Sequence, residues 1–317
     1  MLPAETILIA GPTGVGKTDL SLRLAGELDG EIVGADAFQI YAGLSLLTAK
    51  PSEAARALIP HHLIGSVDPS EAYDAGRYLR EALPIIRDIA ARGKRPIVVG
   101  GTGLYFKALL GGLQELPAGD PALRAELQAL PLPELIERLE ALDPAAVRMV
   151  DLVNRRRVER ALEIVLLTGM PLAVSRRESQ GPIPTPKGMG IRTLLLTRNR
   201  EELNARIEAH VQSMFHQGVE DEVAALPDQD VGPTASMTLG LREIRSLLRH
   251  EITRNEAIEA ICSSTRRYAK RQMTWFGRQH DFPKLNLSLF TDPEKSLAEA
   301  LWLLQSAAPT QVNGTAI

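Results

Sequence analysis

The chain has 317 residues, of which 44% are hydrophobic and 24% are charged, values typical of a globular protein with one large domain or two modest ones. Its net charge of −3 excludes a globally basic field, so a polyanionic partner would have to be bound by local basic patches. The single cysteine, Cys262, excludes an intramolecular disulfide, and the lack of a signal-peptide pattern or a long apolar run predicts a cytoplasmic protein without membrane contact.

The first predicted element is the apolar run Ile7-Leu8-Ile9-Ala10, which is typical of a buried parallel strand. It leads into Gly11-Pro12-Thr13-Gly14-Val15-Gly16-Lys17-Thr18, a match to GxxxxGK[ST], and then into a stretch with helical spacing. This is a phosphate loop, in which backbone N–H groups at a helix N-terminus bind an anion. We expect Lys17 to add a cation and Thr18 to ligate Mg²⁺. The motif indicates a bound di- or triphosphate and leaves open which bond is broken.

The next strand, predicted from Glu31 to Ala35, delivers Asp36 to the sheet edge where open α/β sheets bind their ligands. A plain helix cap is the alternative role for this aspartate. The segment from Ala42 to Pro51 predicts a surface loop that brings one cation, Lys50, within reach of the same site. The adjacent histidines His61 and His62 favour a structural or hydrogen-bonding role over a metal site, because no third ligand has suitable spacing.

A second glycine turn follows the third predicted strand. An amphipathic helix is predicted from Tyr73 to Ala91, and Lys94 to Val99 predicts a strand that runs into Gly100-Gly101-Thr102-Gly103. This turn opens a helix on the same sheet edge as the phosphate loop. We expect Thr102 to face the phosphates across the crevice, although a simple tight turn explains the same residues.

The pattern changes from Leu116 to about Val174, where short helical stretches are interrupted by prolines and no strand is indicated. We expect the proline-rich segment from Gly181 to Pro186 to form a stiff exit, that is, a stiff connection from this helical region back to the rest of the chain. We therefore predict an α/β fold, a P-loop NTPase-like parallel sheet flanked by helices, formed by residues 1–115 and 186–317. An all-helical domain is inserted at 116–185. It contains Asn154-Arg155-Arg156-Arg157-Val158-Glu159-Arg160, which is either a solvated helix face or an RNA-binding surface.

The C-terminal part returns to strand from Arg192 to Thr197 and is then mostly helical. One helix carries an apolar stripe with Arg206 and His210 beside it. A later helix, from Glu256 to about Arg278, gathers cations on one side with aromatics between them: Arg266, Arg267, Lys270, Arg271, Tyr268, Trp275 and Phe276. Such a mixture suits phosphate binding and base stacking, and a buried Trp-Phe pair is the competing explanation for the aromatics. The residues after about Ser306 are expected to be disordered.

With these motifs the chain resembles the bacterial tRNA dimethylallyltransferases of the tRNA isopentenyltransferase family, from Ile7 to about Arg278. Any one shared motif is modest, but the set in this order is highly specific. Its markers are the loop at 11–18, Asp36 with Gln39-Ile40-Tyr41, Thr48-Ala49-Lys50-Pro51, Pro60-His61-His62-Leu63, Val99-Gly100-Gly101-Thr102-Gly103-Leu104-Tyr105, Arg160-Ala161-Leu162-Glu163, Lys270-Arg271-Gln272 and Thr274-Trp275-Phe276.

The resemblance implies transfer of a dimethylallyl group from dimethylallyl diphosphate to an adenosine amine, with Mg²⁺ assistance and release of diphosphate. The acceptor is the adenosine 3′-adjacent to the anticodon in tRNAs reading codons that begin with U. It implies that Asp36 is the base, that Thr102 contacts the diphosphate near the bond that breaks, and that Arg206 binds the diphosphate.

Together with the basic stretches, the resemblance predicts contacts with the tRNA anticodon loop. They are Asp36, Ala37, Phe38, Gln39, Arg124, Arg156, Arg157, Val158, Glu159, Arg160, Arg266, Lys270, Arg271 and Gln272. Ala37 departs from the family, which usually has serine there, and its contribution is in doubt. We expect a monomer.

Three other functions remain open. The same chemistry on a free adenine nucleotide is one, although the insertion and the basic helix favour RNA because a mononucleotide requires neither. A P-loop small-molecule kinase, with Asp36 activating an acceptor hydroxyl, is the second. A non-catalytic RNA-binding adaptor that uses a nucleotide as a switch is the third.

Overall fold

The computed structural model describes residues 2–113, 116–117, 119–178, 190–226, 231–279 and 281–306. The chain divides into two compact units. The core unit comprises Met1–Gly111 with Thr185–Ile317, and the insertion unit comprises Gly112–Pro184, compared with the predicted insertion at 116–185. The predicted stiff exit at 181–186 and the predicted disordered end after 306 lie outside the described residues.

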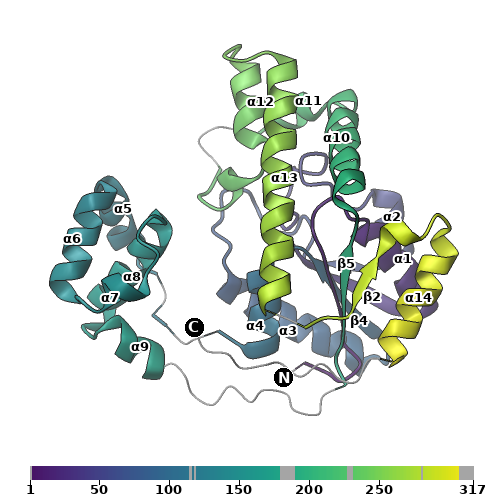
Figure 1. Ribbon diagram of the computed structural model, residues 1–317, viewed down its shortest axis with the longest axis horizontal. Coiled ribbons are helices and arrows are strands. Elements are labelled where there is room, and N and C mark those ends of the chain that lie inside the picture. The colour runs from purple at the N-terminus through teal and green to yellow at the C-terminus, as the bar shows by residue number, and fades with distance from the viewer. Residues whose placement is uncertain are drawn as a thin grey trace. The chain divides into compact units, whose positions relative to one another are not determined.

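Among its described residues, the core unit contains a six-stranded parallel sheet of order β3-β2-β4-β1-β5-β6 (Figure 1). The strands are β1 (Ile7–Ala10), β2 (Gly30–Ala35), β3 (His61–His62), β4 (Arg95–Gly100), β5 (Arg192–Thr197) and β6 (Lys284–Asn286). Every residue of β1 and β2 is buried, as expected for parallel strands that helices cover on both faces. The predicted α/β fold is therefore confirmed.

The strand register aligns three loops at one edge of this sheet. Ala10, the last residue of β1, pairs with Gly100, the last residue of β4, and Gly100 pairs in turn with Ala35 at the end of β2. The two glycine turns and Asp36 thus start side by side, which is the arrangement that the sequence predicts.

The helices of the core unit pack on this sheet and on one another. They are α1 (Lys17–Glu27), α2 (Glu53–Leu58), α3 (Ala75–Ala91), α4 (Gly103–Gly111), α10 (Arg200–His216), α11 (Val219–Ala224), α12 (Leu241–Leu248), α13 (Arg254–Gln279) and α14 (Pro293–Ser306). Helices α10 and α12 pack along the long helix α13, whose C-terminal part reaches α4 (Figure 1). None of the helices in the described ranges has both the length and the apolar character needed to cross a lipid bilayer.

Two aromatic residues near the end of α13 pack against other core-unit elements, Phe276 fully buried and Trp275 partly buried. Phe276 is fully buried, and its ring lies edge-on to that of Phe106 in α4, with centroids 5.4 Å apart. Trp275 packs directly against Gly103, where an added Cβ would lie 2.2 Å from the indole ring. Packing therefore explains this pair, and the competing explanation weighed from the sequence is the correct one for it.

The insertion unit is helical in all its described elements. They are α5 (Pro121–Ala129), α6 (Leu132–Leu142), α7 (Ala146–Met149), α8 (Arg155–Thr168) and α9 (Leu172–Glu178). Helix α8 supplies much of the unit's apolar core, including Val158 and Leu162, which pack with Leu135 and Leu139 of α6. Asn154 caps α8 by accepting a hydrogen bond from the N–H of Arg157, so its first turn presents the arginine run.

A buried ion pair links the sheet to α3 and gives the first prediction. The Glu31 side chain is 4% exposed and accepts hydrogen bonds from Arg92, and its Oε2 lies 2.8 Å from His62 Nε2. Hydrogen bonding from Arg92, then from His62, holds the carboxyl pKa at about 2 instead of 4.5. This stabilisation is complete above pH 4.5 and is lost as the pH falls toward 2. Glu31→Gln should lower the free energy of unfolding by about 3 kcal/mol at neutral pH, measured by urea denaturation.

The matched control is Asp88→Asn, because Asp88 pairs with the same Arg92 but is mostly exposed. It should cost less than about 1 kcal/mol. Equal effects of the two substitutions, or a Glu31→Gln deficit that does not shrink at pH 3, would contradict the assigned role of the buried carboxylate.

Candidate active site

The phosphate loop joins β1 to α1 and places backbone donors around a helix N-terminus. Gly16 is the N-cap of α1 with φ of 104°, a left-handed conformation that a side chain would strain. The Lys17 ammonium donates to the carbonyl oxygens of Gly11 and Pro12, at 3.0 and 2.8 Å. Burial lowers the pKa of Lys17 to about 8, against the opposing charge of Asp36. The lysine therefore lies folded onto the loop, close to that carboxylate.

Two arginines, one in α10 and one directly after β5, donate hydrogen bonds to carbonyl oxygens of this loop. Arg206 of α10 donates from Nε to the carbonyl oxygen of Gly14 at 2.9 Å, and Arg198 donates from Nε to that of Val15 at 2.8 Å. Burial, with the neighbouring Arg206 charge, lowers the pKa of Arg198. Arg198 was not predicted from the sequence, although its position directly after β5 is the signal that could have found it. Lys17 and Arg206 thus bring positive charge to the loop, together with Arg198, which is paired with Glu202, and this environment suits a diphosphate.

Asp36 follows β2 and faces the same crevice. Its Oδ1 accepts hydrogen bonds from the N–H groups of Phe38 and Gln39, at 3.0 and 3.4 Å, which fixes the turn after the strand. The crevice encloses a cavity of about 30 Å³ and is lined by Lys17, Thr18, Ser21, Ile32, Asp36, Gln39, Pro51, His61, Ile64, Val99 and Gly100. Carboxylate, lysine and the first turn of α1 therefore surround one space.

Thr102 is bound to the turn that carries Asp36. Its Oγ1 accepts a hydrogen bond from the N–H of Ala37 at 2.9 Å, and its own N–H donates to the carbonyl oxygen of Ala35 at 3.2 Å. The second glycine turn is thereby fastened to the end of β2. The structure thus brings together the residues that the sequence analysis assigns to the chemistry.

Gln272 of α13 connects the two glycine turns. Its Oε1 accepts from the N–H of Thr13 and its Nε2 donates to the carbonyl oxygen of Gly101, both at 2.9 Å. The residue is 5% exposed, and a Cβ added to Gly101 would lie 2.2 Å from Nε2. The predicted RNA contact does not fit this position, because the amide is buried and already bonded to both turns.

The segment from Ala42 to Pro51 is more ordered than a surface loop. The Glu222 carboxylate accepts from the N–H groups of Leu46 and Leu47, at 2.7 and 2.9 Å. Gln39 donates from Nε2 to the carbonyl oxygens of Thr48 and Ala49, and Lys50 donates to that of Tyr41. The Lys50 ammonium is therefore used inside the loop, and burial lowers its pKa to about 8.

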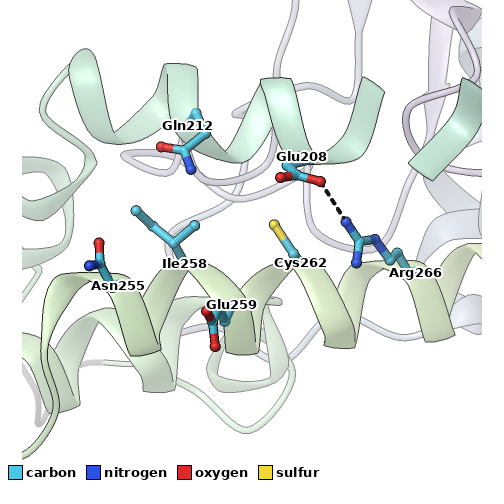
Figure 2. Close-up of a pocket in the computed structure, with 7 residues that line it drawn as sticks. All are labelled: Glu208, Gln212, Asn255, Ile258, Glu259, Cys262 and Arg266. Carbon is cyan, nitrogen blue, oxygen red and sulfur yellow. Dashed lines mark hydrogen bonds and ion pairs between the residues drawn. The ribbon is translucent and has the colours of Figure 1, made fainter. Parts of the chain in front are cut away.

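The cationic side chains of α13 differ in their ion pairing and exposure. Arg266 pairs with Glu208 of α10 at 2.9 Å, beside a cavity of about 290 Å³ into which Cys262 also points (Figure 2). Burial raises the pKa of the Cys262 thiol. Lys270 and Arg271 are exposed, and the Arg271 guanidinium lies over the ring of Tyr268, 5.6 Å from its centroid. Lys270 and Arg271 are thus more available to an RNA phosphate than Arg266.

The arginines predicted to bind RNA in the insertion unit also fall into two groups. Arg124 and Arg160 both pair with Glu163, which is 1% exposed. Burial raises the carboxyl pKa of Glu163, but the hydrogen bonds from these two arginines hold it below its usual value. By contrast, Arg156 and Arg157 are exposed, and Arg157 meets Asp151 only at 3.6 Å.

Two other RNA contacts predicted in this unit have structural partners. Val158 is fully buried in the core of the unit, so its side chain is not available to RNA. Glu159 is largely buried and pairs with Arg155 at 2.7 Å. The spacing of a helix explains both, because every third or fourth residue of α8 turns toward the core.

Comparison with known proteins gives one consistent family. The IPP transferase family model matches residues 39–279. The tRNA dimethylallyltransferase 1 of Citrifermentans bemidjiense is 43% identical over 279 residues, covering 87% of this chain and 90% of that protein. The tRNA dimethylallyltransferase of Akkermansia muciniphila is 42% identical over 299 residues, covering 93% and 98%.

Solved structures agree with the sequence relatives. The tRNA isopentenylpyrophosphate transferase of Bacillus halodurans matches with a TM-score of 0.69 and 32% identity, covering 95% of this chain and 96% of that one. A eukaryotic dimethylallyltransferase acting on tRNA matches with a TM-score of 0.78 and 28% identity, covering 93% and 77%. The resemblance inferred from the motifs is confirmed, and the chain belongs to the IPP transferase family.

Proposed function

We propose that this protein is a tRNA dimethylallyltransferase. It transfers the dimethylallyl group of dimethylallyl diphosphate to the exocyclic amine of the adenosine 3′-adjacent to the anticodon, in tRNAs that read codons beginning with U. The family relationship supports this assignment. The observation that carries it is the single crevice in which the Asp36 carboxylate lies beside Lys17 and the first turn of α1.

The donor's diphosphate would lie on the phosphate loop. Backbone N–H groups from Gly14 to Thr18, the Lys17 ammonium and the Arg206 guanidinium would then stabilise the negative charge that develops on the diphosphate as its bond to the allylic carbon breaks. Lys17 has to turn from the carbonyl oxygens that it now contacts to the phosphates. Arg198 braces the same loop, and its guanidinium is also paired with the Glu202 carboxylate.

Asp36 would act as the base on the acceptor. The exocyclic amine of adenine is a weak nucleophile, because its lone pair is delocalised into the ring. A carboxylate that removes a proton as the C–N bond forms contributes about 10²–10⁴ in rate. Oδ1 of Asp36 is used by the turn that follows β2, and Oδ2 is the oxygen that would take the proton.

The residues at the crevice also fit Mg²⁺ as the cofactor. Thr18 provides a hydroxyl on this cavity, and hard oxygen donors are what this ion prefers. Within the described ranges no three His, Cys, Asp or Glu side chains gather to hold a metal, so phosphate oxygens and waters would complete the shell. Bound there, Mg²⁺ would neutralise charge on the departing diphosphate.

The tRNA would be bound through the exposed cations of each unit. The acceptor base has to be turned out of the anticodon loop to reach Asp36, and phosphate contacts from both units would hold the loop in that form. We assign this role to Arg156, Arg157, Lys270 and Arg271, whose side chains are exposed.

Replacing Arg156 and Arg157 together by glutamine should weaken tRNA binding about tenfold near physiological salt. It should also reduce the slope of log K against log salt by about 1.5, because two phosphate contacts are lost. Filter binding over a salt series measures both quantities. Arg138→Gln is the matched control, since Arg138 lies in the same unit but pairs with Glu126 and Glu134. If the double variant keeps the wild-type slope, these arginines do not contact RNA phosphates.

One assay separates the proposed function from its rivals. The protein is incubated with Mg²⁺ and tRNA, and with either ATP or dimethylallyl diphosphate, while consumption of each is followed. We expect only dimethylallyl diphosphate to be consumed, and only when tRNA is present. Consumption of ATP would favour the kinase, and equal turnover with adenosine monophosphate in place of tRNA would favour the free-nucleotide enzyme.

A further inference from the structure

The Gln272 amide joins two turns just beyond the point where their strands stop pairing. The pairing of β1 with β4 ends at Ala10 and Gly100. Past these residues, the Gln272 oxygen accepts from the N–H of Thr13 and its nitrogen donates to the carbonyl oxygen of Gly101, both at 2.9 Å. Reversing the amide would set donor against donor and acceptor against acceptor. The side chain therefore holds the phosphate loop and the second glycine turn at one separation.

Packing fixes the amide in this place. Gln272 is 5% exposed, and a Cβ added to Gly101 would lie 2.2 Å from its Nε2 and 3.2 Å from its Cδ. One turn later on α13, Trp275 packs against Gly103 and the buried Phe276 ring lies edge-on to an aromatic ring of α4. Helix α13 is thus anchored on α4 and presents the amide from a fixed position.

The second glycine turn continues this connection to the turn that carries Asp36. Thr102, which follows Gly101, donates from its N–H to the carbonyl oxygen of Ala35 at 3.2 Å. Its Oγ1 accepts from the N–H of Ala37 at 2.9 Å. Asp36 lies between these two residues. A chain of hydrogen bonds therefore runs from the phosphate loop through Gln272 to the turn of the proposed base.

The neighbours of Gln272 on α13 face elsewhere. Lys270 and Arg271 are exposed, whereas Gln272 is buried against the two turns. Successive residues of a helix point in directions about 100° apart, so one short stretch can offer cations to RNA and an amide to the crevice. The role of Gln272 is therefore separable by substitution from that of its charged neighbours.

We propose that Gln272 is a positioning residue for prenyl transfer: it sets the distance between the donor held on the phosphate loop and the Asp36 carboxylate that serves the acceptor. This inference rests on the proposed function. Transfer needs the allylic carbon and the amine about 3–3.5 Å apart, and a displacement of about 1 Å costs about 10² in rate. Loosening the two turns should therefore lower kcat and leave the affinity for tRNA intact.

The test is a double-mutant cycle on kcat at saturating tRNA and donor. Gln272→Ala removes the amide and should lower kcat about 10²-fold, while the Kd for tRNA changes less than about twofold. Gly101→Ala keeps the glutamine, but the new Cβ displaces its amide and should cause a comparable loss. The flexible end of a side chain gives way at little cost in stability, so this variant should fold. In the combined variant the shortened side chain leaves room for the Cβ, and kcat should be no lower than in Gln272→Ala alone.

Glu31→Gln is the matched control, because it removes a buried interaction from the same unit and does not line the crevice. It should lower the unfolding temperature and keep the wild-type kcat, which separates destabilisation from positioning. Losses that multiply in the combined variant, or a Glu31→Gln loss as large as that of Gln272→Ala, would overturn the inference. So would a Gln272→Ala variant with normal kcat and tenfold weaker tRNA binding, which would make Gln272 an RNA contact. Wild-type protein that transfers no dimethylallyl group would instead overturn the proposed function.

Discussion

Asp36→Asn should reduce kcat for prenyl transfer by about 10²–10⁴ and leave the affinity for tRNA nearly unchanged. Asparagine keeps the side-chain oxygen that accepts from Phe38 and Gln39, so the turn after β2 is retained. What it removes is the basic oxygen that takes the proton from the adenine amine. Single-turnover kinetics with saturating donor measures the chemical step apart from product release.

Asp68→Asn is the matched control for this substitution. Asp68 makes the same kind of turn, in which its Oδ1 accepts from the N–H of Ser70 at 2.9 Å, but it is exposed and does not line the crevice. It should retain wild-type kcat. An Asp36→Asn variant with near-normal turnover would show that Asp36 serves only as a cap and is not the base.

Lys17→Gln should lower kcat/KM for dimethylallyl diphosphate by about 10²–10³, because a charged donor to the departing diphosphate is lost. The affinity for tRNA should not change. Glutamine can still donate to a loop carbonyl, so thermal unfolding should report a folded protein. Isothermal titration with the donor in the absence of tRNA measures binding without turnover.

The pH dependence of donor binding tests the same lysine. Because the pKa of Lys17 is about 8, its side chain in the donor-free protein is mostly cationic below pH 8 and mostly neutral above it. Donor affinity should therefore fall about tenfold between pH 7 and pH 9. Lys17→Arg keeps its charge throughout this range, and its affinity should not fall. A decline of the same size in Lys17→Arg would assign the titration to another group.

The fold could be predicted because its signals are local. Apolar runs such as Ile7–Ala10 and Arg192–Thr197 identified strands, and a helix was predicted after the glycine loop, where α1 begins at Lys17. The short edge strands β3 and β6 were missed, since two or three residues carry no readable alternation. The position of Thr102 beside the turn that carries Asp36 followed from the rule that parallel strands end at one edge.

What the sequence could not provide were contacts between distant segments. Gln272 lies 259 residues from Thr13, and no local pattern reveals that its amide holds the phosphate loop. The arginine run of α8 looked uniform, yet the structure pairs Arg160 with a buried glutamate and leaves Arg156 exposed. The Arg160–Glu163 pair lies within α8, but the burial of Glu163 and its second partner, Arg124 of α5, come from tertiary packing.

In the proposed reaction the phosphate loop holds the leaving diphosphate while Asp36 deprotonates an adenine amine. Mass spectrometry of nucleosides from tRNA incubated with protein, Mg²⁺ and dimethylallyl diphosphate tests it most directly. We predict adenosine with one dimethylallyl group on its exocyclic nitrogen, at the position after the anticodon, and almost none with Asp36→Asn. Unmodified adenosine with the wild-type protein, or the group on another base, would contradict the account.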